Sequence, residues 1–298
     1  MDHLKKLVLQ NGRLNSEKIY KSESLYQGMN GKFVERFYLS ETESYIFKPL
    51  TNNGQLGKEV WVYEQVLPAL PDIYPKLLGY SVAEELDENW MIFEDLGSLH
   101  HGFQEDIILE VIRLMAGWHA IPVDGIVGLP LTGLKPKIEE IILELTGKKQ
   151  AVLEKISPLL DGVDFSKKLV LSHGDLHIGN VAMVGEKVMV LDWEHTHLNT
   201  PYWDLYHLLD LSHPIYPRRV TSQFRECALK TYCEHAGLEA DPFLKEYYLF
   251  SALFSIWMLM LIQSDLGSGQ KKWQREQLEV QRGETVATLR DCMRALLG

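Results

Sequence analysis

The first third of the chain carries the short apolar runs that are typical of β-strands. Four runs of aromatic and β-branched residues lie between turn-forming residues, at Lys32–Leu39, Ser44–Phe47, Lys76–Ala83 and Trp90–Phe93. The glycines and asparagine of residues 28–31 predict a tight hairpin loop. One helix is predicted over Lys58–Leu67, because Val60 and Tyr63 share a helical face. The pattern therefore predicts a sheet with one helix.

Beyond residue 97 the pattern becomes mostly helical. Apolar residues recur at helical spacing in five segments, at Glu105–His119, Pro136–Ile156, Arg218–Ala236, Pro242–Gln263 and Trp273–Leu297. A β-rich island at 169–193 interrupts them. The polar segment Glu94–Gly97 marks the change, so we predict domains at residues 1–96 and 97–298. A β-rich part joined to a helical part is typical of the α+β class.

Composition and charge narrow the functional class. The formal net charge of −11 argues against a nucleic-acid or anionic-membrane surface, and a cationic substrate would suit it. Three cysteines without a C-x-x-C pair predict no disulfide framework and favour a reducing, cytoplasmic setting. The first residues lack the apolar run of a signal peptide. Tyr247–Ile262 is shorter than the roughly 20 residues that span a bilayer, so we predict a buried helix.

The loop at 173–180 concentrates polar side chains between two predicted strands. Asp175 and Asn180 lie in it, and Asp192 ends the hairpin that follows. Phosphoryl transfer needs a carboxylate that accepts the attacking hydroxyl and oxygen ligands that hold Mg²⁺ against the nucleotide phosphates. Asp175 suits the first role, and Asn180 and Asp192 suit the second. Turn formation by ordinary loop residues is the alternative for any of them alone.

The spacing of these residues resembles that of a known superfamily. A His-x-Asp sequence with Asn five positions after the Asp, and a later Asp that closes a hairpin, is similar to the aminoglycoside phosphotransferase and choline kinase superfamily, which is related to protein kinases. The resemblance continues in 114–122 and in Pro201–Leu205. It implies that Asp175 is the catalytic base, that Asn180 and Asp192 bind the metal, and that Asp204 braces a loop supported by His173.

The resemblance also implies a two-lobed protein-kinase-like fold, with a nucleotide-binding β-rich N-terminal lobe and a helical catalytic and substrate-binding C-terminal lobe. Lys48 would then contact the phosphates of ATP, or of GTP as the alternative, and pair with Glu59, with Glu64 as the second choice for this partner. The backbone around Glu94 and Leu96 would read the adenine edge. The loop at 28–32 lacks the glycine-rich pattern of protein kinases, so its role as a phosphate cover stays open.

Two other classes of protein compete with this interpretation. A metallohydrolase could use the four histidines at 173, 177, 195 and 197, but Asn180 is followed by Val181 rather than by a histidine. A non-catalytic binding protein, such as a spore-coat-like protein, would usually lack one of Lys48, Asp175, Asn180 and Asp192. We therefore predict a Mg²⁺-dependent phosphotransferase.

Its predicted acceptor is a hydroxyl of a small molecule, of the aminoglycoside, choline or amino-alcohol kind. Asp106, Glu194 and Asp210 are candidate contacts for a cationic acceptor. Trp193 and Trp203 either line its pocket through cation–π contacts or pack in the core.

Overall fold

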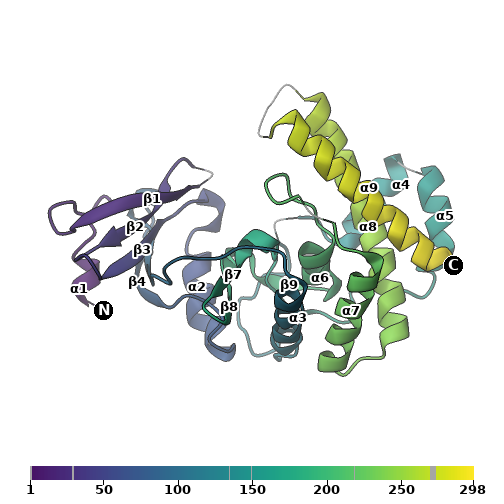
Figure 1. The fold of residues 1–298 in the computed structure, drawn as a ribbon, viewed down its shortest axis with the longest axis horizontal. Coiled ribbons are helices and arrows are strands. Elements are labelled where there is room, and N and C mark those ends of the chain that lie inside the picture. The colour runs from purple at the N-terminus through teal and green to yellow at the C-terminus, as the bar shows by residue number, and fades with distance from the viewer. Residues whose placement is uncertain (1, 29, 134, 149, 218, 269–272) are drawn as a thin grey trace. The chain divides into compact units, whose positions relative to one another are not determined.

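The computed structural model describes residues 2–28, 30–133, 135–148, 150–217, 219–268 and 273–298. Contacts within the chain divide it into two compact units (Figure 1). Unit 1 comprises Met1–His100 and Ala182–Glu194, and unit 2 comprises His101–Val181 and His195–Gly298. The predicted boundary at 96/97 differs from this division mainly because the segment 182–194 groups with the first unit.

Unit 1 is built on a five-stranded antiparallel sheet. Its strands follow the order β1-β2-β3-β5-β4 and span Lys21–Gln27 (β1), Phe33–Tyr38 (β2), Ser44–Pro49 (β3), Leu77–Ser81 (β4) and Trp90–Glu94 (β5). Phe37, Phe47, Trp90 and Ile92 are buried on the sheet and pack with Leu4 and Leu7 from the N-terminal segment that contains helix α1 (Asp2–Lys5). Burying these aromatic and aliphatic side chains fixes which face of each strand points inward.

Further elements complete unit 1. Helix α2 spans Lys58–Gln65 and follows Gly57, whose φ of 69° suits a residue without a side chain. Short 3₁₀ turns lie at Asn53–Gln55, Leu67–Ala69 and Leu86–Glu88. Strands β7 (Val181–Val184) and β8 (Lys187–Val190) form a hairpin, of which only Val181 is assigned to unit 2. The amide of Val190 donates to the carbonyl of Ile73, which fixes the end of β8 within the unit.

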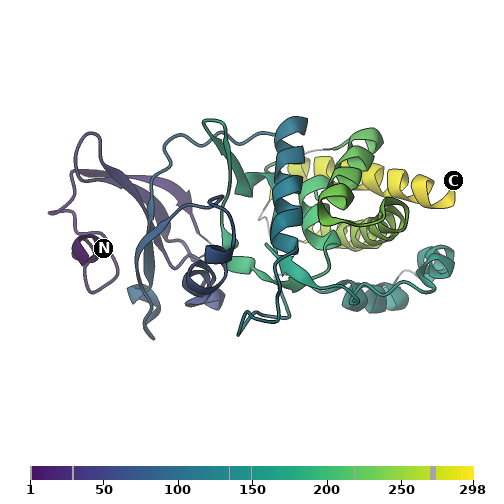
Figure 2. The ribbon, with the colours of Figure 1, turned by 90° about the horizontal axis from the view of Figure 1, so that it is seen from below.

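Unit 2 is mainly helical. Its helices span Glu105–His119 (α3), Ile138–Lys148 (α4), Gln150–Leu160 (α5), Tyr202–Leu209 (α6), Ser222–Ala236 (α7), Ala240–Gly267 (α8) and Arg275–Leu297 (α9). Strands β6 (Val170–Ser172) and β9 (His197–Asn199) pair antiparallel, and 3₁₀ turns span Ile178–Asn180 and Trp193–His195, the second crossing the division between the units. Helix α9 lies along α8, and α7 lies along α3 (Figures 1 and 2).

Helix α8 is the centre of this helical packing. It contacts α4, α5, α6, α7 and α9. Among the described residues it is the one helix long and apolar enough to cross a membrane, and most of its apolar stretch is buried inside the unit. A core helix was the prediction for this segment.

Trp193 and Trp203 are also fully buried, so they pack in the core.

The helix predicted at Pro136–Ile156 corresponds to α4 and α5, and residue 149 between them lies outside the described residues. Helix α6 was not predicted. All of its residues are buried, so its sequence lacks the alternation of apolar and polar faces that marks a surface helix.

Candidate active site

The candidate residues of unit 1 meet at one ammonium group. Lys48 comes from β3, Glu59 from α2, and Asp192 and Glu194 from the segment after β8. The Nζ atom of Lys48 lies 2.7 Å from a carboxylate oxygen of Glu59, 2.7 Å from Asp192 Oδ1 and 3.9 Å from Glu194 Oε2. The structure therefore brings together Lys48, its predicted partner Glu59 and the predicted metal ligand Asp192.

Glu59, Asp192 and Glu194 form a carboxylate cluster around Lys48, and Lys58 also interacts electrostatically with Glu194. Burial and the two neighbouring carboxylates raise the pKa of Glu59 to about 7, although Lys48 opposes this. Burial alone would lower the pKa of Lys48, but Asp192, Glu59 and Glu194 outweigh it and raise that pKa well above its ordinary value. Three carboxylates this close together favour binding of a further cation.

The geometry of the carboxylate cluster also suits a cation. One oxygen from each of its members lies within 4.8 Å of the others, and carboxylate oxygens are the ligands that Mg²⁺ prefers. The side chain of Asp192 is 42% exposed, far more than those of Glu59 and Glu194. Its φ of 61° lies in the left-handed region, which is uncommon for a residue with a side chain and is enriched at functional sites.

The other candidate residues of unit 1 lie apart from this ammonium. Glu64, the second choice for the partner of Lys48, accepts a hydrogen bond from the Tyr80 hydroxyl. The carboxylate of Glu94 accepts from the amide of Lys76, and Leu96 follows β5 as a partly buried residue. The loop between β1 and β2 is closed by a hydrogen bond from Gly28 N to the Lys32 carbonyl, and its Met29 lies outside the described residues.

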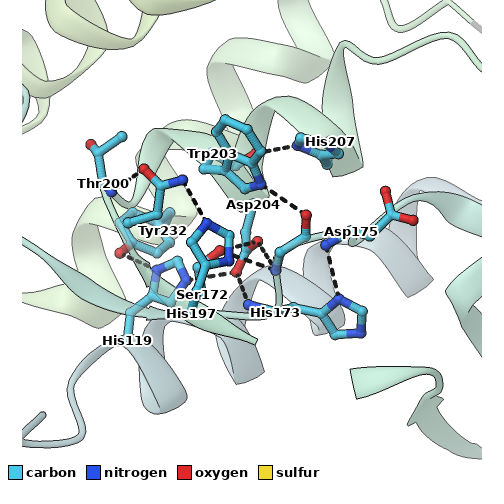
Figure 3. Close-up of polar contacts among 12 residues, drawn as sticks. His119, Ser172, His173, Asp175, His197, Thr200, Trp203, Asp204, His207 and Tyr232 are labelled. Carbon is cyan, nitrogen blue, oxygen red and sulfur yellow. Dashed lines mark hydrogen bonds and ion pairs between the residues drawn. The ribbon is translucent and has the colours of Figure 1, made fainter. Parts of the chain in front are cut away.

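In unit 2, a fully buried carboxylate braces the loop that carries Asp175. Asp204, on α6, accepts hydrogen bonds from Ser172 Oγ at 2.8 Å and from the amides of His173 at 2.8 Å and Gly174 at 3.2 Å (Figure 3). His119 Nε2 lies 3.2 Å from the same carboxylate. Burial alone would raise the pKa of Asp204, but His119 and the backbone donor hold it well below its ordinary range.

The backbone of the loop fits this brace closely. Gly174 has a φ of 87°, and a Cβ atom at this position would lie 2.1 Å from the carbonyl oxygen of His195. The Gly174 carbonyl accepts a hydrogen bond from Trp203 Nε1, and the Asp175 amide donates to His173 Nδ1 (Figure 3). His173 thus supports the loop through its ring and its backbone amide. Glycine is the residue that this conformation and this close contact require.

Asp175 is surrounded by basic side chains. Lys135 Nζ lies 3.6 Å from Asp175 Oδ1, and His177 Nε2 lies 3.8 Å from Asp175 Oδ2. Burial alone would raise the pKa of Asp175, but Lys135, His207 and the other nearby histidines outweigh it and hold the pKa well below its usual range. Asp175 is therefore ionised at neutral pH, as a residue that accepts a proton must be.

Asn180 is fixed to the same loop. Its amide nitrogen donates to the backbone carbonyl of Asp175 at 2.9 Å. Within the described residues, its amide oxygen accepts no hydrogen bond. An amide oxygen in this state is a suitable magnesium ligand.

Comparisons with known proteins place these residues in a family. A family model described as the phosphotransferase enzyme family matches residues 71–247, which is more than half of the chain. The chain belongs to the phosphotransferase enzyme family. A search of curated protein sequences gives no significant match.

Solved structures show which fold this phosphotransferase has. A protein from Ralstonia eutropha named as an aminoglycoside phosphotransferase matches with a TM-score of 0.66 and 13% identity over 93% of this chain and 95% of that one. Choline kinase from Cryptosporidium parvum matches with a TM-score of 0.60 and 13% identity over 99% of this chain and 95% of that one. APH(2″)-IIa, solved as a ternary complex with streptomycin and ATP, matches with a TM-score of 0.56 and 17% identity over 98% of this chain and 96% of that one. The predicted two-lobed kinase-like α+β fold is confirmed.

Three findings about this phosphotransferase bear on the remaining sequence predictions. Within the described residues, the carboxylate cluster is the one group of three or more His, Cys, Asp or Glu side chains that could hold a metal ion. The histidines at 173, 177, 195 and 197 form no group of this kind. Asp210 is fully buried and accepts hydrogen bonds from Arg225, Tyr247 and Ser251, so it is part of the core rather than an acceptor contact. Lys135 was missed, because no local motif marks a lysine 40 positions before Asp175.

Proposed function

We propose that this chain is a kinase of small molecules, which transfers the terminal phosphate of ATP to a hydroxyl group and requires Mg²⁺. The observation that carries the proposal is the Lys48 site, where one buried ammonium pairs with Glu59 and Asp192 in a member of the phosphotransferase family. GTP is the alternative nucleotide. The neighbour that was solved with streptomycin and ATP supports both ATP and a small-molecule acceptor.

On the nucleotide side, the proposed roles follow from charge. Lys48 would bind phosphate oxygens, and Glu59 would hold its ammonium in place. Asp192 and Asn180 would hold Mg²⁺, since one is a partly exposed carboxylate and the other has an amide oxygen that accepts no hydrogen bond from the described residues. The bound metal would neutralise charge on the phosphates. The backbone near Glu94 and Leu96 remains the proposed reader of the adenine edge.

On the acceptor side, Asp175 would act as the general base. The acceptor hydroxyl would donate its hydrogen bond to the Asp175 carboxylate, which is ionised at neutral pH. As the oxygen–phosphorus bond to the acceptor forms, the bond to the leaving nucleoside diphosphate breaks and the hydroxyl proton passes to Asp175. Asp204 and His173 would act by positioning this loop. The three free cysteines suit the proposed cytoplasmic setting.

The test of this function is Asp175→Asn, measured as acceptor-dependent release of nucleoside diphosphate. We expect turnover to fall by about 10²- to 10⁴-fold, because the amide cannot take the proton, while affinity for Mg²⁺ and ATP is kept. Asp161→Asn is the matched control, since Asp161 is an exposed aspartate of the same unit. Unchanged turnover in Asp175→Asn would remove Asp175 from the mechanism, and absence of nucleotide binding to the wild-type chain would refute the proposed function.

A further inference from the structure

A partly buried lysine lies beside the proposed base, and the sequence gives no sign of it. The Nζ atom of Lys135 is 2.6 Å from His207 Nε2 and 3.6 Å from Asp175 Oδ1. Its side chain is 19% exposed. Within the described residues these two groups are its polar partners, so the third N–H direction of the ammonium is available to a ligand.

His207 fixes the direction in which Lys135 points. His207 is fully buried on α6, and its Nδ1 lies 2.9 Å from the Trp203 carbonyl, to which it donates (Figure 3). Its Nε2 is then the acceptor for the Lys135 ammonium. Burial and Lys135 lower the pKa of His207 to about 3, which keeps the ring neutral. A neutral acceptor orients the ammonium without cancelling its charge.

The segment that carries Lys135 is held against β9. The amide of Leu198 donates to the Pro130 carbonyl at 2.8 Å. A Cβ atom at Gly133 would lie 2.3 Å from the His197 ring, so this segment packs on the ring without room for a side chain. Lys135 thus lies two positions beyond a glycine that packs on β9.

We propose that Lys135 binds an anionic group of the acceptor, so that the acceptor is a hydroxylated carboxylate or phosphate ester rather than a cationic amine. This inference rests on the proposed function, because it needs the acceptor hydroxyl to lie at Asp175. A hydroxyl bonded to this carboxylate lies about 3 Å from it, and Lys135 lies 3.6 Å from the same carboxylate. An anionic group a few bonds from the hydroxyl is therefore within reach of the ammonium.

The same geometry disfavours an amino alcohol. An ammonium a few bonds from the hydroxyl would lie close to that of Lys135 in a mostly buried setting, where like charges repel strongly. His177 adds a second basic side chain beside Asp175. The net charge of the whole chain suits a cationic acceptor. The charges beside the reacting hydroxyl should nevertheless determine which acceptor binds, because screening by salt limits the reach of distant charges.

The test compares acceptors that differ in charge on the same carbon skeleton. One set is glycerate, glycerol 3-phosphate, glycerol and 3-aminopropane-1,2-diol, and the other is gluconate, glucose 6-phosphate, glucose and glucosamine. Transfer from ATP is measured with the wild type, Lys135→Met, Lys135→Arg and the control Lys137→Met, which lies on the same segment. The carboxylates and phosphate esters within each set separate the two sources of negative charge.

We expect the wild type to prefer an anionic member of at least one set. Lys135→Met should raise the KM of that acceptor by about 10- to 100-fold, the loss of one charged hydrogen bond, and should leave the KM of ATP unchanged. Lys135→Arg should keep part of the preference, and Lys137→Met all of it. A lysine that only positions Asp175 would instead lower kcat for every acceptor alike.

The contrary outcomes are distinct. A wild-type chain that binds and hydrolyses ATP but uses neutral or cationic compounds better, or uses no anionic compound in either set, overturns the inference and leaves the proposed function standing. An equal loss of kcat for all acceptors in Lys135→Met also overturns it. A chain that neither binds nor hydrolyses ATP or GTP refutes the proposed function itself.

Discussion

In unit 2 the buried carboxylate of Asp204 accepts hydrogen bonds from Ser172, from two backbone amides and from His119, whereas in unit 1 three carboxylates share the ammonium of Lys48. Asp204 has no exposed surface, while the side chain of Asp192 is 42% exposed. The protein itself supplies the donors that Asp204 requires. The carboxylate cluster instead gathers negative charge at a point that is partly open to solvent, where a cation can bind.

This difference separates a structural carboxylate from a ligand-binding one. A buried charge is tolerated when the fold surrounds it with donors, and it then fixes the backbone around it. Carboxylates that crowd one another raise the free energy of the empty site, so a cation gains binding energy there. The two pKa shifts agree: that of Asp204 is lowered, and that of Glu59 is raised to about 7.

The largest effect on stability should come from Asp204→Ala. The change leaves several buried donors without an acceptor, so we expect the free energy of unfolding to fall by about 3–5 kcal/mol. Urea unfolding followed by circular dichroism measures this, with Asp161→Ala as the exposed control. A loss below about 1 kcal/mol would mean that the brace contributes little and that Asp204 is not a structural carboxylate in this sense.

The carboxylate cluster should respond to ligand instead. With Mg²⁺ and ATP at about 100 times the dissociation constant, the wild type should gain about 2.7 kcal/mol of stability, seen as a rise in Tm. Asp192→Ala should lose the metal-dependent part of this gain, and Asp72→Ala, an exposed aspartate of unit 1, should keep it. An equal rise in Tm for Asp192→Ala and the wild type would contradict the role of Asp192 as a metal ligand.

The sequence predicted those helices and strands in which apolar and polar residues follow a regular spacing. Helix α3 spans the predicted Glu105–His119, and the β-rich island predicted at 169–193 contains strands β6, β7 and β8. The eight residues of α6 were missed, because a helix that is buried on every side has no polar face to mark its period.

The site was predictable where its residues lie close in the chain. Asp175 and Asn180 share a loop whose spacing matches a family, and Lys48 and Glu59 were paired through the same resemblance. Their roles stay predictions, although the structure shows Lys48 and Glu59 in contact. Lys135 could not be found in this way, because its contact with His207 depends on the packing of its segment against β9.

A change in pH should affect stability in opposite directions at His207 in unit 2 and at Glu59 in unit 1. The effect of His207 is the larger one. Its pKa is about 3 in the folded chain and about 6.5 in an unfolded one. The unfolded state therefore binds the proton as pH falls through 6.5, and stability is lost by about 2 kcal/mol between pH 7 and pH 5. His207→Gln should lose less over this range than the wild type, as measured by urea unfolding. The exposed His235→Gln should behave like the wild type.

Glu59 should show the opposite and smaller dependence. Its pKa is raised from 4.5 to about 7, so the folded chain holds a proton that the unfolded chain has released, and stability falls as pH rises from 5 to 7.5. Because the cluster is partly open to solvent at Asp192, we expect a loss of only about 1 kcal/mol. Glu59→Gln should remove it in metal-free buffer, while the exposed Glu41→Gln should retain it. If Glu59→Gln follows the wild-type curve over this range, the pKa of Glu59 is not raised in the folded chain, and the contrast of the carboxylate cluster with Asp204 disappears.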